Sequence, residues 1–255
     1  MSTSPSETPY AAPVSNLQEA APTEQVLSIE EALSRGYDFR VGELISEAWR
    51  LVAGSKGIII GGFLLYYAAI MLINTVLGFI FGLLGLEAEA DNLVGLFVSQ
   101  FAISILGSVL TYPLLAGLML IGIRRAAGQE INFNQLFIPF NNPMPVIITG
   151  ILMMLLVYAG MLLLLLPGLY LAIAYMLALP LVIERGLSPW QALETSRKAI
   201  SQHWFKIFGW ALLLGLIVGL SIIPLGIGLV WTIPLWMIST GVLYRTIFGV
   251  LPAAA

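Results

Sequence analysis

The chain lacks cysteine altogether and contains a single histidine, His203. A chain without cysteine builds no disulfide, thiol nucleophile or thiolate metal site. One histidine without nearby carboxylates in the sequence is a poor metal site, so we expect His203 to act as an interfacial anchor, with no metal and no cofactor. The sequence also lacks a phosphate-binding glycine loop, a nucleophile elbow and an HExxH motif. These absences argue against an enzyme.

Charge is scarce as well. Charged residues make up 10% of the 255 residues and hydrophobic residues 59%, whereas soluble domains carry about 25% charge. Four long stretches have no charge at all, and a membrane span takes roughly 20 apolar residues. Two of these stretches are long enough to cross and return, with turns expected at 166–168 and 224–228. The uncharged stretches are 57–86, 92–123, 131–183 and 207–244.

We therefore expect an all-α integral membrane protein with six transmembrane helices arranged as three hairpins. The segments 168–183 and 207–222 are short for a span, so re-entrant hairpins stay open as an alternative. The predicted spans lie near 58–84, 93–123, 144–166, 168–183, 207–222 and 226–244.

The distribution of basic residues gives an orientation. Basic residues near span ends are held on the cytoplasmic side, and all 11 Lys and Arg residues can be placed on one side of this topology. Only the acidic Glu87, Glu89 and Asp91 fall in a connection that faces outward. We expect both termini in the cytoplasm. The basic residues are Arg35, Arg40, Arg50, Lys56, Arg124, Arg125, Arg185, Arg197, Lys198, Lys206 and Arg245.

The remaining segments are polar or amphipathic. Residues 1–27 have the composition of a disordered cytoplasmic tail, and 249–255 form a C-terminal tail. Residues 28–57 are expected to contain a short helix and an amphipathic helix, and further interfacial helices are expected near 132–140 and 188–203. Each hairpin of the membrane domain, 58–248, is thus preceded by a helix suited to the headgroup layer.

Candidate contact residues follow from these helices. No ionisable residue lies inside a predicted span, which argues against ion pumps, proton-coupled carriers and charge-selective pores. Asn74 and Gln100 are candidates for hydrogen bonds between helices. Arg197 falls within an apolar stripe and is expected to reach a lipid phosphate or to pair with Glu184 or Glu194. The candidate lipid or partner contacts are Trp49, Trp190, Arg197, Lys198, His203, Trp204 and Lys206.

Two spacings suggest helix packing. Gly78 and Gly82, like Gly215 and Gly219, have the GxxxG spacing that permits close helix approach, and we favour packing within the monomer over a dimer face. The pattern T-x-P-L followed by Arg occurs at 111–124 and again at 232–245. Pro180 and Arg185 occupy a looser counterpart in the second hairpin. The pattern indicates either a triplicated hairpin or a coincidence among leucine-rich helices.

Three stretches carry a family resemblance, and they are Leu166-Pro167-Gly168-Leu169-Tyr170-Leu171, Leu179–Lys198 and His203-Trp204-Phe205-Lys206-Ile207. They resemble a group of uncharacterised bacterial inner-membrane proteins, the YciC-like family. Gly36-Tyr37-Asp38-Phe39 and Ala48-Trp49 also fit it. More distantly, the chain is similar to the membrane domain of glycerophosphodiester phosphodiesterases. The resemblance covers 36–248 and implies six helices and a bacterial inner-membrane location. It transfers no catalytic residue.

We expect a non-enzymatic membrane protein that organises or regulates a membrane partner or the lipid environment from its cytoplasmic face. The alternative is a transporter, or its accessory subunit, for an apolar or lipid-like solute. Membrane lipids and a membrane-protein partner are the expected contacts. The basic residues are too sparse to suggest nucleic acid, and the sequence does not define an oligomeric state.

Overall fold

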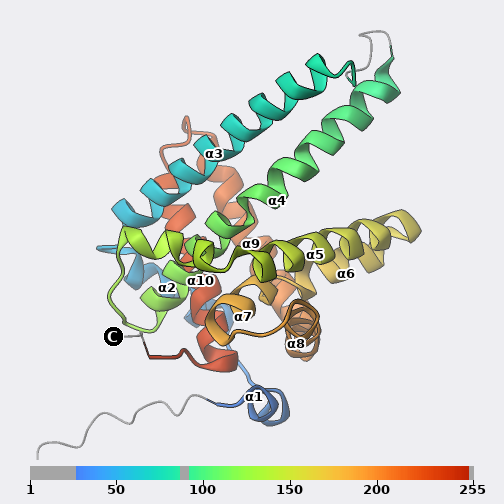
Figure 1. Cartoon of the computed structure of the whole chain (residues 1–255). Helices are drawn as coiled ribbons and strands as arrows, with labels where there is room; N and C mark the ends of the chain where they lie inside the picture. The colour runs from blue at the N-terminus through green and yellow to red at the C-terminus, as the bar shows by residue number, and fades with distance from the viewer. Residues whose placement is uncertain (1–26, 87–91, 253–255) are drawn as a thin grey trace, which may run out of the picture.

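The computed structural model describes residues 27–86 and 92–252. Within these ranges the chain is all-helical, without β-strands (Figure 1). The tail predicted for 1–27 lies outside the described residues except for Leu27, as do the acidic residues of the predicted outer connection. The elements are α1 (Ile29–Arg35), α2 (Val41–Val52), α3 (Lys56–Leu83), α4 (Leu93–Ala126), the 3₁₀ helix η1 (Phe133–Asn141), α5 (Pro143–Leu163), α6 (Leu165–Ala174), α7 (Ala178–Arg185), α8 (Pro189–Ser201), α9 (Trp204–Ile222) and α10 (Leu229–Phe248).

Five helical segments in the described ranges are long and apolar enough to cross a membrane. They coincide with the first five predicted spans, and α6 and α7 together form the fourth. The sixth predicted span, 226–244, corresponds to α10, which is not among the five. Most residues of α10, including Thr232, Ser239 and Thr240, are buried in the protein. The five are Lys56–Leu83, Leu93–Ala126, Pro143–Leu163, Leu165–Arg185 and Trp204–Ile222.

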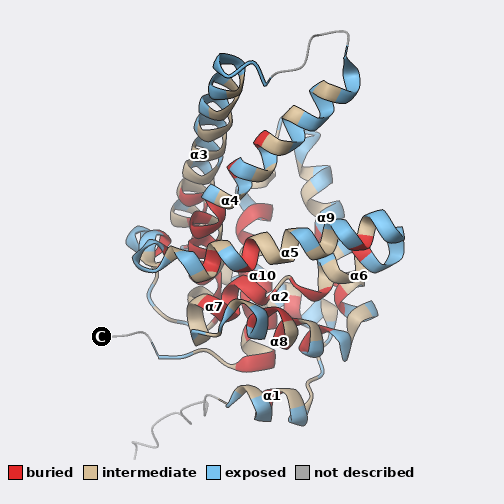
Figure 2. Ribbon diagram, turned by 45° about the vertical axis from the view of Figure 1, so that its right-hand side comes forward, coloured by how far each residue is buried: buried red, intermediate tan, exposed pale blue. Residues whose placement is uncertain are grey.

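Helices adjacent in sequence pack in pairs, α3 with α4, α5 with α6 and α9 with α10. The α3/α4 pair and the α5/α6 pair point in different directions from a common base (Figure 1). Figure 2 shows that buried residues gather in this base, whereas the far ends of α3, α4, α5 and α6 are exposed. No part of the most apolar window of α3 is buried in the protein. Such exposed apolar surface is expected where lipid is the solvent.

The centre of the base is the contact between α4 and α10, the most extensive between any two elements. Two glycines make it possible. A Cβ atom on Gly122 would lie 2.5 Å from the carbonyl oxygen of Met237, and one on Gly241 would overlap the carbonyl oxygen of Gly122. The Trp210 indole of α9 packs onto this core and donates to Ser239 Oγ at 2.9 Å. Both occurrences of T-x-P-L, in α4 and α10, are buried here.

The glycines of the two GxxxG spacings differ from Gly122 and Gly241. Cβ atoms built on Gly78, Gly215 and Gly219 would meet nothing within 4 Å. These glycines therefore do not mediate the close packing within the monomer that their spacing suggested. Spacing alone identified the wrong glycines, because the pattern says nothing about which side of an apolar helix faces a neighbour.

The predicted span 168–183 is broken at 175–177, between α6 and α7. Ser196 of α8 occupies the break. Its hydroxyl donates to the Ala174 carbonyl at 2.7 Å and accepts from the Leu177 amide at 3.2 Å. Ser196 is fully buried. One side chain thus satisfies backbone groups that the break leaves without helical partners.

The predicted interfacial helices are partly covered by protein. Leu44, Ala48 and Val52 of α2 are buried, and α2 packs along α10. The buried face of α8 likewise includes Leu193 and Ile200. In η1, Leu136 is buried, whereas three phenylalanines on the same short helix stay about 40% exposed, and these are Phe133, Phe137 and Phe140.

Candidate functional site

The N-terminal segment, Leu27–Ser55, contacts the ends of several later helices and forms with them a polar layer. Arg125, in the last turn of α4, donates from Nε to the carbonyl oxygen of Leu51 at 2.9 Å and from Nη2 to that of Ala53. Leu51 lies in the last turn of α2 and Ala53 is its C-cap, where helix carbonyls lack internal partners. Arg125 therefore joins the end of α4 to the end of α2.

Arg245, near the end of α10, joins the same two helices. Its guanidinium forms an ion pair with Glu47 of α2 at 2.6 Å and donates to the carbonyl oxygen of Ala126. Both side chains of the ion pair are partly shielded from solvent. Charge-assisted hydrogen bonds of this kind are stronger than neutral ones. The ends of α2, α4 and α10 are thus held together by two arginines.

His203 and Lys206, at the start of α9, contact the connection between α1 and α2. His203 Nε2 lies 2.6 Å from the Tyr37 carbonyl oxygen, which can only accept, so this nitrogen carries the proton. Lys206 pairs with Asp38 at 2.6 Å and lies over the ring of Phe39. The hydrogen bond from Lys206 lowers the pKa of the Asp38 carboxyl below its ordinary value of 3.8.

Tyr37 and Gln202 extend this contact. The Tyr37 hydroxyl donates to the carbonyl oxygen of Ala199 at 3.0 Å, and Gln202 Nε2 donates to that of Leu33 at 2.9 Å. Burial raises the pKa of the Tyr37 hydroxyl above its ordinary value of 10.0. The tyrosine is therefore a neutral donor at physiological pH, and it fixes the N-terminal segment to the end of α8.

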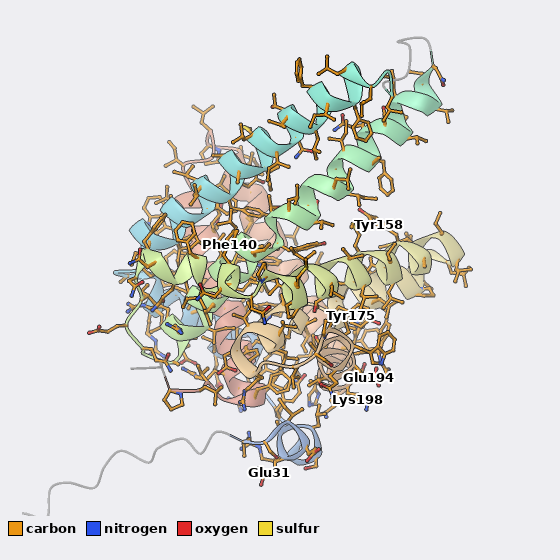
Figure 3. The ribbon with its side chains drawn as sticks, viewed as in Figure 1. Glu31, Phe140, Tyr158, Tyr175, Glu194 and Lys198 are labelled. Carbon is orange, nitrogen blue, oxygen red and sulfur yellow. The ribbon has the colours of Figure 1, made fainter. Side chains whose placement is uncertain are left out.

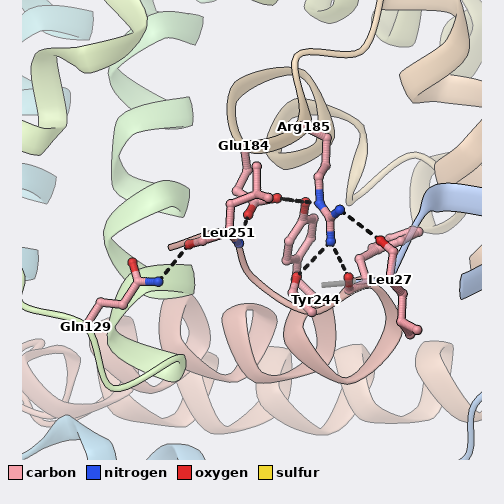
Figure 4. A network of polar contacts seen from close by, with 8 residues as sticks. Leu27, Gln129, Glu184, Arg185, Tyr244 and Leu251 are labelled. Atoms are coloured by element: carbon pink, nitrogen blue, oxygen red, sulfur yellow. Dashed lines mark hydrogen bonds and ion pairs between the residues drawn. The ribbon is translucent and has the colours of Figure 1, made fainter. Parts of the chain in front are cut away.

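A buried ion pair lies where the two ends of the described chain meet (Figure 4). Glu184 and Arg185, at the end of α7, pair at 2.9 Å with side chains 5% and 9% exposed. Glu184 accepts from the Tyr244 hydroxyl and from the Leu251 amide. Arg185 donates to three backbone carbonyls, those of Leu27, Phe248 and Gly249. Sequence reasoning treated Arg185 only as a topology signal and missed this network.

Arg197 pairs with Glu194 at 2.7 Å, one of the two partners that the sequence left open. Lys198 reaches the same carboxylate at 3.5 Å and is more exposed. The hydrogen bond from Arg197 holds the pKa of the Glu194 carboxyl below its ordinary value of 4.5. Glu184, the other candidate, is occupied by Arg185 and Tyr244. A partly exposed pair of this kind contributes little to folding, roughly 0.2–1 kcal/mol.

The three candidate tryptophans have different surroundings. Trp204 donates its indole N–H to the Tyr170 carbonyl at 3.2 Å and stacks on Phe208. Trp49 of α2 and Trp190 of α8 are 53% and 61% exposed. Large apolar side chains that stay exposed beside charged helices are typical of membrane interfaces and of partner surfaces.

The two candidate interhelical residues also differ. Asn74 donates to the carbonyl oxygen of Ile70 in its own helix at 2.8 Å. Its amide also lies against α4, since a Cβ atom on Gly107 would be 3.0 Å from Asn74 Nδ2. Gln100 is exposed. The structure therefore places Asn74, but not Gln100, at a helix contact.

Comparisons with protein-family models, with curated proteins and with solved structures find no match for this chain.

Reversing one charge at the Asp38–Lys206 contact should loosen the N-terminal segment. In Lys206→Glu, two carboxylates face each other, so we expect amide exchange over residues 28–40 to become roughly two- to fivefold faster. The double variant Asp38→Lys with Lys206→Glu should return exchange to the wild-type rate. Because the pKa of Asp38 is lowered, the wild-type contact contributes at neutral pH and is lost as the pH falls below about 3.8. Equal exchange in the single and double variants would contradict a direct pair.

Proposed function

We propose that this chain is a non-enzymatic protein of the bacterial inner membrane, which organises or regulates a membrane partner or its lipid environment from the polar layer. The observation that carries the proposal is the exposure of Trp49 and Trp190 on the two amphipathic helices α2 and α8, whose opposite faces are buried. The apolar helices supply the anchor, and the polar layer supplies the contact surface. The resemblance to the YciC-like group supports the same location.

The contact surface can be tested by photo-cross-linking in intact membranes. A photoreactive amino acid at position 49 or 190 should give a reproducible cross-linked protein or lipid species. The matched control is position 216, where Leu216 is 57% exposed on the apolar helix α9, away from the polar start of that helix. It should label bulk lipid only. Identical products at all three positions would remove the support for a surface on α2 and α8.

The proposed topology has six crossings, with α10 as the last and both termini in the cytoplasm. The connection at Leu164, together with the first turn of α6 that contains Pro167, and the turn 223–228 then face outward. Because the chain has no cysteine, Pro167→Cys and Leu225→Cys each provide a single label site, and Leu225 is 95% exposed. We expect both to react with an impermeant maleimide in intact cells after outer-membrane permeabilisation. Lys198→Cys should react only after lysis. Protection of residues 167 and 225 would instead support re-entrant hairpins.

An apolar cavity of about 310 Å³ favours a second candidate function, the carrying of an apolar solute. It lies between α3, α9 and α10 and is lined by Phe63, Gly215, Val218, Ile233, Trp236 and Met237. Gly215→Leu would fill it. Flux of an apolar solute in proteoliposomes that falls in this variant, but not in Gly219→Leu, would favour the carrier.

A further inference from the structure

A polar cavity of about 590 Å³ lies at the end of α4, beside the polar layer. Apart from Ile138, every residue that lines it carries a charge or an amide. The lining residues are Arg124, Gln129, Glu130, Asn132, Asn134, Gln135 and Ile138. Arg124 belongs to the last turn of a helix that is apolar enough to span a membrane. The cavity is therefore expected at the depth of lipid headgroups.

The local sequence builds the cavity wall in a defined way. Gly128 adopts a left-handed conformation (φ 70°) after α4. Its amide donates to the Arg125 carbonyl, and the Gln129 amide donates to the Arg124 carbonyl, which is the Schellman arrangement at a helix end. The Asn132 side chain then caps η1 by accepting from the Gln135 amide. Both glutamines are thus held by ordered backbone.

Arg124 differs from its neighbours. Arg125, Arg185 and Arg245 all donate to backbone carbonyls. In residues 27–86 and 92–252, the Arg124 guanidinium has no hydrogen-bond or ion-pair partner, and it lines the cavity. A guanidinium has five N–H donors in a planar fork that matches a phosphate.

In the part of the chain that the structure describes, Gln129 and Gln135 have unpaired hydrogen-bond acceptors, whereas Arg124 has unpaired donors. Gln129 Nε2 donates to the Leu251 carbonyl (Figure 4) and Gln135 Nε2 donates to the Glu130 carbonyl, which fixes the orientation of both amides. Their Oε1 atoms are buried without a hydrogen-bond donor among the described residues, and Gln135 is 6% exposed. Unpaired buried acceptors of this kind are unusual in folded proteins. A ligand that satisfies them must bring hydrogen-bond donors, and N–H donors that carry a positive charge would also match the Glu130 carboxylate in the same lining.

We propose that this cavity binds a phosphoethanolamine group, with its phosphate on Arg124 and its primary ammonium among Glu130 and the glutamine oxygens. A bare phosphate fits less well, because the Glu130 carboxylate would repel it. The two amide oxygens are covered by neighbouring atoms, so the cavity wall must adjust as the ammonium enters. The exposed phenylalanines of η1, which bounds the cavity, offer apolar surface for the acyl chains of a phospholipid. This inference rests on the proposed membrane function and names its lipid.

The inference can be tested by native mass spectrometry of the delipidated full-length protein. The protein is incubated with equal amounts of phosphatidylethanolamine, phosphatidylcholine and phosphatidylglycerol that have the same acyl chains. The choline headgroup has the same phosphate and positive charge but no N–H donor. We therefore expect ethanolamine-lipid adducts to exceed choline-lipid adducts by about tenfold, since hydrogen bonds to charged groups are strong. Water-soluble glycerophosphoethanolamine tests whether the bound group comes from a membrane lipid or from a soluble molecule. It displaces the lipid only if the headgroup alone is sufficient for binding.

Two substitutions test which residue binds the phosphate and which binds the ammonium of the ligand. Arg124→Gln should reduce adducts of all three lipids, whereas Glu130→Gln should reduce only the preference for ethanolamine over choline. The matched control is Arg40→Gln, which replaces an arginine whose side chain is 83% exposed. If Arg124→Gln does not fold, as judged by circular dichroism, Glu130→Gln still decides the assignment of the ammonium. Equal ethanolamine and choline adducts in the wild type would overturn the proposal. Cross-links at positions 49 and 190 that persist in that case would leave the proposed function standing.

Discussion

Gly241→Val is expected to separate α4 from α10 and to destabilise the protein by about 3 kcal/mol or more. The reason is steric. The position of a Cβ atom on Gly241 is already occupied by the backbone carbonyl of Gly122, and backbone cannot rotate away as a side chain can. The whole helix must move, and the contact that it would open is the most extensive in the protein. Thermal unfolding in mild detergent measures the loss.

The chain offers a matched control in Gly219→Val, where the added side chain meets nothing within 4 Å. We expect its stability to stay within about 0.5 kcal/mol of the wild type. Gly122→Val should resemble Gly241→Val, since its Cβ would lie 2.5 Å from the Met237 carbonyl oxygen. If Gly241→Val and Gly219→Val unfold at the same temperature, the close contact between α4 and α10 does not exist in the folded protein.

These glycines show what the sequence could predict. The length and position of the apolar helices follow from uncharged stretches, so five candidate spans appear where they were expected. The neighbours of each helix do not follow. A span that is apolar on all sides has no periodic face to indicate its buried side. Gly78 and Gly215 have a recognised spacing but open surroundings, whereas Gly122 and Gly241, which no spacing connects, lie in contact.

The polar layer was predictable only as a set of residue types. The start of an uncharged stretch placed His203 and Lys206 near a helix end, but their partners Tyr37 and Asp38 lie far away in the sequence. For Arg197 the sequence left a lipid phosphate, Glu184 and Glu194 open, and Glu194 on the same helix is the partner observed. The cavity beside Arg124 left no recognisable pattern, because its other lining residues are mostly amide side chains from the connection between α4 and α5, whose fold depends on Gly128.

Arg185→Met is the second substitution for which we expect a large effect. Removing the guanidinium leaves the Glu184 carboxylate buried without its counter-ion, although Tyr244 and Leu251 still donate to it. Breaking a buried pair on one side typically costs roughly 3–5 kcal/mol, more than the intact pair contributes. It also frees the carbonyls of Leu27 and Phe248. We expect a lower unfolding temperature and faster amide exchange at residues 248–251.

The double variant Glu184→Leu with Arg185→Met separates charge burial from backbone anchoring. Without the carboxylate there is no buried charge, so the double variant should recover part of the unfolding temperature that Arg185→Met loses. Amide exchange at residues 248–251 should stay fast, because the carbonyls that Arg185 holds in the wild type are still unpaired. Lys198→Met, at a side chain 56% exposed, is the surface control and should change stability by less than about 0.5 kcal/mol. A double variant less stable than Arg185→Met would mean that Glu184 stabilises the fold without its arginine, through Tyr244 and Leu251 alone.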